Sequence, residues 1–124
     1  MTIKVLVVDD QYHNIRLLEQ ILEEISEDIQ IINADTGEKA ISVAKEIEFD
    51  LVLMDISLPD MDGMQITKEL KIFPQYRNTP FIAVTANATL KDEEIFKRIF
   101  DDYVFKPIDE EVFTEKIKKW IGVM

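Results

Sequence analysis

The sequence predicts an α/β fold in which one parallel sheet of five strands is covered by helices on both faces. Short apolar runs alternate strictly with longer segments whose apolar residues recur at helical spacing. This alternation is typical of strands joined by helical crossovers, which return the chain to the same edge of a parallel sheet. The apolar runs are continuous, as expected for strands that are buried on both faces. We therefore expect one domain over residues 1–124.

The five strands are expected, in chain order, at residues 4–8, 29–32, 51–54, 80–84 and 103–105. Each strand is followed by a segment with one apolar face, and the five helices are expected to begin near residues 14, 36, 63, 91 and 109. Gly63 and Pro74 mark the two ends of the third helix, and Asp109 is placed to cap the last one.

The composition narrows the classes of function. The formal net charge is −11, which argues against direct binding to nucleic acid or to anionic membrane surfaces, because both need clustered Lys and Arg. The absence of cysteine excludes disulfides and thiolate metal sites. There is no apolar run of about 18 residues that could span a membrane and no signal-peptide pattern at the start. We expect a cytoplasmic protein without a membrane segment.

The residues that end the strands form the most informative pattern. Asp9 and Asp10 end the first strand, Asp55 the third, Thr85 the fourth and Lys106 the fifth. The carboxyl ends of parallel strands share one edge, and a flavodoxin-like strand order of 2-1-3-4-5 would place strands one and three side by side with a crevice between them. The expected architecture is therefore a flavodoxin-like (βα)5 three-layer sandwich whose crevice contains three carboxylates.

This group of residues has the chemistry of phosphoryl transfer. Three close carboxylates repel one another, and a divalent cation removes the repulsion. A ligand set of oxygens without His or Cys suits Mg2+. Lys106 adds a positive charge and Thr85 a hydroxyl, so that Asp55 could attack a phosphoryl group while the cations neutralise its oxygens.

Four segments carry a family resemblance: VLVVDD, LVLMDISLPDMDG, AVTANA and YVFKP. They resemble the signature segments of the response-regulator receiver domain of two-component phosphorelay signalling, as found in chemotaxis-type single-domain regulators. The segments occur in the family's order and at its spacing, and the resemblance covers the whole chain.

The resemblance implies a role for each matching residue of the site. Asp55 matches the phosphoacceptor, and Asp9 and Asp10 match the acidic pair that holds Mg2+. Ser57 lies where a backbone carbonyl completes the metal site, and Lys106 matches the lysine that contacts a phosphoryl oxygen. The Lys106-Pro107 bond is expected to be cis.

The resemblance also implies a switch and its partners. Thr85 matches the hydroxyl that bonds the phosphoryl group, and Tyr103 the aromatic residue that changes rotamer with it. The phosphoryl donor would be a sensor histidine kinase or a histidine phosphotransfer domain. The surface of the fourth helix, fifth strand and fifth helix would contact a downstream target, a fused output or a second copy. One departure is that no glycine ends the fourth helix near Ile99 and Phe100, which are expected to be core or an apolar docking surface.

Three alternatives stay open from the residues alone. An Mg2+-dependent phosphatase with an aspartyl nucleophile would share the chemistry, but would place Asp-x-Asp after its first strand. A flavodoxin would share the fold, but Asp9 and Asp10 would repel its phosphate. A purely structural module would have a vestigial site, against which the intact Asp55, Thr85 and Lys106 argue.

Other polar residues have simpler interpretations. Asp60 and Asp62 are expected to be turn or helix-start residues and Asp102 a surface or turn residue. His13, the only histidine, is expected to lie exposed on the first helix, and Trp120 in the core beneath the last helix.

Overall fold

The central sheet has the predicted parallel arrangement and order, β2-β1-β3-β4-β5. The computed structural model describes residues 2–56, 58, 60–86 and 90–122. Within them the strands are β1 (Ile3–Val8), β2 (Ile29–Ala34), β3 (Leu51–Asp55), β4 (Phe81–Thr85) and β5 (Asp102–Phe105). Every neighbouring pair is parallel.

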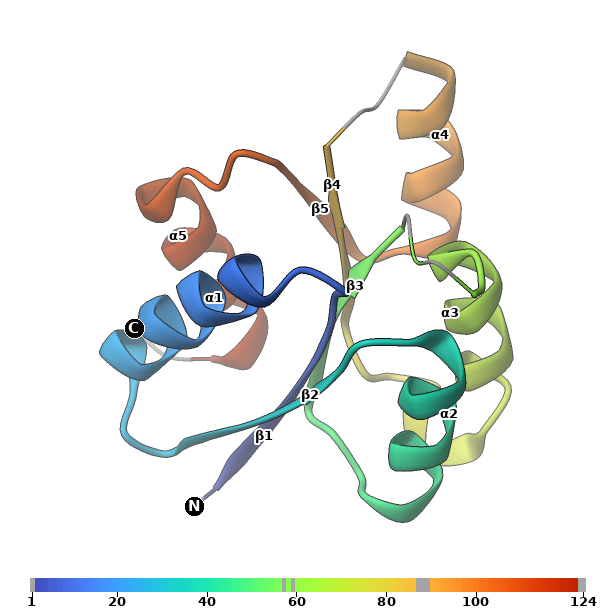
Figure 1. The fold of residues 1–124 in the computed structure, drawn as a ribbon, viewed down its shortest axis with the longest axis horizontal. Coiled ribbons are helices and arrows are strands. Elements are labelled where there is room, and N and C mark those ends of the chain that lie inside the picture. Colours follow the sequence, from blue (N-terminus) through green and yellow to red (C-terminus); the bar gives the residue numbers. More distant parts are fainter. Residues whose placement is uncertain (1, 57, 59, 87–89, 123–124) are drawn as a thin grey trace.

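Helices cover both faces of the sheet, which gives the three layers that the alternation predicts (Figure 1). One face carries α1 (Tyr12–Ile25) and α5 (Glu110–Ile121), and the other carries α2 (Gly37–Glu46), α3 (Gly63–Lys71) and α4 (Leu90–Ile99). A short 3-10 helix, η1 (Pro74–Tyr76), follows α3. The sheet separates two apolar cores, one beneath each layer of helices.

Two elements extend two residues beyond their expected bounds, for local reasons. Helix α1 begins two residues earlier than predicted, and the Asp9 carboxylate accepts a hydrogen bond from the backbone N–H of Gln11 just before it, at 2.9 Å. Strand β2 continues to Ala34, because its pairing with β1 extends to the register pair Val8 and Ala34. Polar Asn33 is exposed on this edge strand, so it did not mark the segment as a strand.

The connection from α4 to β5 needs no left-handed residue. The backbone N–H of Phe100 donates to the carbonyl of Phe96 at 2.7 Å, and that of Asp101 donates to the carbonyl of Phe81 at 2.9 Å. Phe100 is buried in the core between the sheet and helices α2, α3 and α4, and Ile99 packs against the same core. Phe100 is therefore core, and Ile99 is half-buried at the margin of that core.

The expectation that Asp102 is a surface or turn residue was wrong. Asp102 begins β5 and is half-buried, and its carboxylate accepts hydrogen bonds from Lys116 Nζ at 3.0 Å and from Trp120 Nε1 at 2.9 Å. Trp120 is half-buried rather than fully in the core, since its indole N–H reaches this carboxylate. Both partners belong to α5, so only the tertiary structure brings them to Asp102.

Within the described ranges, no helix combines the length and the apolar character that crossing a bilayer requires.

Candidate functional site

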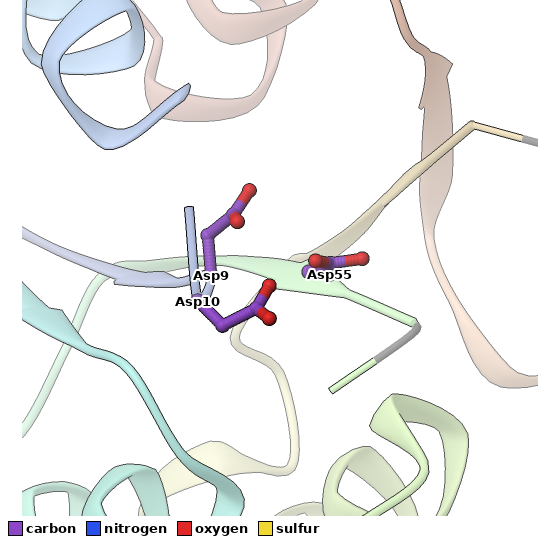
Figure 2. Close-up of side chains that lie close together, drawn as sticks. All are labelled: Asp9, Asp10 and Asp55. Atoms are coloured by element: carbon purple, nitrogen blue, oxygen red, sulfur yellow. The ribbon is translucent and has the colours of Figure 1, made fainter. Parts of the chain in front are cut away.

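Three carboxylates meet where β1 and β3 end. Asp9 and Asp10 follow β1, and Asp55 is the last residue of β3. The two strands are neighbours, with Val8 opposite Met54, so that the residues after β1 lie beside Asp55. One carboxylate oxygen from each of the three residues lies within 4.8 Å of the others, and Figure 2 shows the three side chains around one space.

The burial of these carboxylates differs. Asp9 is 1% exposed and Asp55 5% exposed, whereas Asp10 is exposed. Asp9 is also fixed by the hydrogen bond from Gln11. Two carboxylates in such an environment need a nearby cation, because transfer of a charge out of water is costly unless it is paired.

Lys106 supplies one positive charge to this site. Its Nζ lies 3.2 Å from Asp9 Oδ2 and 3.5 Å from Asp55 Oδ2, and its side chain is 16% exposed. The backbone N–H of Lys106 donates to the carbonyl of Thr85 at 2.7 Å, which joins the residue after β5 to the end of β4. The Lys106-Pro107 peptide bond is cis, as expected.

The donor set fits a hard divalent cation. Asp9, Asp10 and Asp55 offer oxygen ligands only, at a spacing that one ion can bridge. Three carboxylates against one lysine leave negative charge in excess, which Mg2+ would balance. Ser57, whose carbonyl was expected to complete the metal site, lies outside the described residues.

Thr85 and Tyr103 lie on adjacent strands. Thr85 ends β4 one position beyond Val84, the register partner of Asp55, and it is 4% exposed. Tyr103 pairs with Ala83 and Phe105 with Thr85, so these four residues share one face of the sheet. The Tyr103 ring is half-buried and its centroid lies 5.3 Å from that of Phe105.

Asp60 connects the segment after β3 to another helix. Its carboxylate accepts hydrogen bonds from the backbone N–H groups of Gly37 and Glu38, at 2.8 and 3.1 Å. At the start of α2 these N–H groups have no acceptor within the helix. Their hydrogen bonds lower the pKa of Asp60, and the bond from Gly37 has the larger effect. Nothing in the sequence indicates this contact, because its partners are 23 and 22 residues away. Asp62, as expected, starts α3 and accepts from the backbone N–H of Met64 at 2.8 Å.

Gly63 sets the shape of the backbone next to Asp55. A Cβ at this position would meet the carbonyl oxygen of Asp55, and the Cα of Ile56 at 2.8 Å. The backbone N–H of Gly63 donates to the carbonyl of Ile56 at 3.0 Å. The start of α3 can therefore pack directly on the end of β3. His13 is exposed on α1, as expected.

The chain matches known proteins along almost all of its length. The family model of the response regulator receiver domain matches residues 5–118. The polar-differentiation response regulator DivK of Brucella ovis is 37% identical over 123 residues, which cover 98% of both chains. The signal transduction histidine-protein kinase BarA of Shigella flexneri is 38% identical over 112 residues, which are 90% of this chain but only 12% of BarA.

A solved structure has the same fold. It is the receiver domain of the sensor histidine kinase PA1611 from Pseudomonas aeruginosa, which has a TM-score of 0.86 and 29% sequence identity. The match covers 98% of this chain and 99% of that one, and that structure holds a magnesium ion in its active-site cleft.

Proposed function

The chain belongs to the response regulator receiver domain family, and from this premise we propose that Asp55 is the phosphoacceptor of a signalling switch. The donor is a phosphohistidine on a sensor histidine kinase or on a histidine phosphotransfer domain. The observation that carries this proposal is the convergence of Asp9, Asp10, Asp55 and Lys106 at one edge of the sheet. Family membership separates the chain from the flavodoxin and phosphatase alternatives.

The transfer is a displacement at phosphorus. A carboxylate oxygen of Asp55 forms a bond to phosphorus while the bond between phosphorus and the donor's imidazole nitrogen breaks, and the imidazole keeps that electron pair. The product is an acyl phosphate on Asp55. Lys106 reaches both Asp9 and Asp55, so its ammonium group is placed to pair with a phosphoryl oxygen.

Asp9, Asp10 and Asp55, with the Ser57 carbonyl, are the residues that would hold Mg2+, which when bound neutralises negative charge on the phosphoryl oxygens. Asp9 is buried and fixed by Gln11, so it is oriented before any ligand enters. Asp10 is exposed and provides the side of the site that faces solvent.

The readout is a change in the surface formed by α4, β5 and α5. Thr85 turns toward the phosphoryl group and Tyr103 changes rotamer with it, which shifts a two-state equilibrium. A downstream protein, a fused output domain or a second copy binds that surface. We propose that residues 1–124 act as one receiver domain in the cytoplasm, and that the chain promotes only its own phosphorylation and dephosphorylation.

The test is phosphorylation by acetyl phosphate in the presence of Mg2+. Intact-mass measurement should show the addition of one phosphoryl group that hydroxylamine removes. Asp55→Asn should abolish the adduct, and chelation of Mg2+ should prevent it. Asp50→Asn is the matched control, because Asp50 lies before the other end of β3, where its carboxylate accepts from the backbone N–H of Lys4 at 2.8 Å.

Two results would overturn the proposal. One is an adduct that persists in Asp55→Asn, and the other is the absence of any adduct in the unaltered chain. Rapid multiple turnover of a small phosphate ester would instead point to the phosphatase alternative.

A further inference from the structure

Lys116 of α5 reaches around the open edge of the sheet. Its Nζ donates to Asp102 Oδ1 at 3.0 Å and to the backbone carbonyl of Tyr103 at 2.7 Å, and it lies 5.0 Å from the centroid of the Tyr103 ring. Tyr103 packs against the core beneath α2, α3 and α4, whereas Trp120, which also donates to Asp102, packs against the core beneath α1 and α5. One ammonium group therefore contacts both sides of the edge strand β5.

The charge of Lys116 is held in place by its surroundings. Asp102 accepts from Lys116, from Trp120 Nε1 at 2.9 Å and from the backbone N–H of Tyr103 at 2.8 Å. Burial opposes ionisation of Asp102, but the hydrogen bonds from Trp120 and Lys116 outweigh it and lower the pKa of Asp102. The carboxylate therefore stays charged and fixes the ammonium group beside the ring.

The ammonium group of Lys116, which comes from α5, contacts the face of the Tyr103 ring. A cation over the face of a tyrosine ring is stabilising, and more so where both groups are partly shielded from water. The ring is half-buried, and the side chain of Lys116 is 29% exposed. A rotamer change that takes the ring away from Lys116 would break this contact, while the hydrogen bond from Lys116 to the Tyr103 carbonyl can persist.

We propose that Lys116 is a positioning residue that restrains the Tyr103 ring at the edge of the sheet and so sets the threshold of the switch. This inference rests on the proposed function, because it assumes that Tyr103 moves when Asp55 is phosphorylated. A contact made in only one of two arrangements shifts the equilibrium toward that arrangement. Loss of the contact should therefore tighten the binding of any ligand that favours the moved ring.

The experiment measures the affinity for beryllofluoride at fixed Mg2+, from the fractions of free and bound amide signals in NMR spectra. Lys116→Met should bind beryllofluoride about 2- to 5-fold more tightly than the unaltered chain, and Lys116→Arg should return the affinity close to the original value. Lys119→Met is the matched control, because Lys119 lies on the same helix and over the Trp120 ring, at 5.2 Å from its centroid, and should leave the affinity unchanged.

A double-mutant cycle separates positioning from a general effect on the fold. In a Tyr103→Leu background there is no ring to restrain, so Lys116→Met should then leave the affinity unchanged. If Lys116→Met does not fold, Lys116→Gln removes the charge and keeps a donor. Equal affinity in the Lys116 variant and the unaltered chain, or tightening that persists without the ring, would overturn the inference. Failure of the unaltered chain to bind beryllofluoride would instead overturn the proposed function.

Discussion

Lys106 compensates for the concentration of negative charge in the site. It pairs with two carboxylates whose side chains are 2% and 6% exposed. Replacement of all partners of a buried ion pair by apolar side chains changes the stability of a fold little. Removal of one partner alone is costly, because it leaves an uncompensated buried charge. The lysine and the proposed Mg2+ would therefore act on the same excess of charge, the lysine permanently and the ion when bound.

Replacement of Lys106 should make the fold depend on Mg2+. Lys106→Met should lower the free energy of unfolding by about 3 kcal/mol in the presence of a chelator, because Asp9 and Asp55 lose their cation. Added Mg2+ should stabilise this variant more than the unaltered chain, since it replaces the missing charge. Urea denaturation with and without Mg2+ measures both effects. Exposed Lys68 provides the control Lys68→Met, and equal stability of the Lys106 variant in chelator would contradict this account.

At the scale of the element, Tyr76 ties η1 to the end of α2. Its hydroxyl lies 2.6 Å from the carbonyl oxygens of both Ala44 and Ile47, and the side chain is 0% exposed. Carbonyls at the end of a helix have no partner within the helix, and Tyr76 shares its proton between two of them. Burial is the main cause that raises the pKa of Tyr76 above its ordinary value of 10.0.

The Tyr76 contribution should disappear in alkaline solution. Tyr76→Phe should lower the free energy of unfolding by about 1–2 kcal/mol at neutral pH, because the buried carbonyls lose a donor. Since the pKa is higher in the folded state, this contribution is complete below pH 10.0 and is lost as the pH rises further. The stability difference between the unaltered chain and the variant should therefore narrow above that pH. A constant difference in chemical denaturation from pH 9 to pH 11, about one unit either side of the ordinary tyrosine value, would refute it.

The strands and helices were predictable because their patterns are local in the sequence. Several side-chain contacts were not, because their partners are distant in the sequence. Apolar runs and helical spacing identified the five strands and five α-helices in order, but not the short 3-10 helix η1. The polar residues at the strand ends identified Asp9, Asp10, Asp55 and Lys106 as neighbours. Asp102 shows where this reasoning stops. An aspartate between a helix and a short strand has the same sequence signal whether or not a lysine 14 residues later covers it.

At the scale of the whole molecule, charge is distributed unevenly. The chain has 25 acidic and 14 basic residues, and the last turn of α1 has no basic residue to complement the helix dipole. Glu23 and Glu24 are exposed in that turn. Self-repulsion of this kind destabilises the compact state without altering which fold forms.

Salt should therefore stabilise the protein. An increase in NaCl from about 10 mM to about 200 mM shortens the Debye length from roughly 30 Å to below 10 Å, and the melting temperature should rise. The variant Glu23→Gln/Glu24→Gln should be more stable than the unaltered chain at low salt and should gain less from added NaCl, because part of the repulsion is already gone. A melting temperature independent of NaCl would show that the net charge is locally compensated.

The ion pair between Lys106 and Asp9 joins residues that are 97 positions apart. Asp9 follows β1 and Lys106 follows β5, the first and last strands along the chain. The pair can therefore form only after β3 and β4 have been added beside β1 and β5 has docked on β4. Closure of such a long loop occurs late in folding, since its entropic cost must be met before the contact forms. We therefore expect the acidic residues of the site to come together before Lys106 joins them. Competence to receive a signal would then coincide with the finished fold.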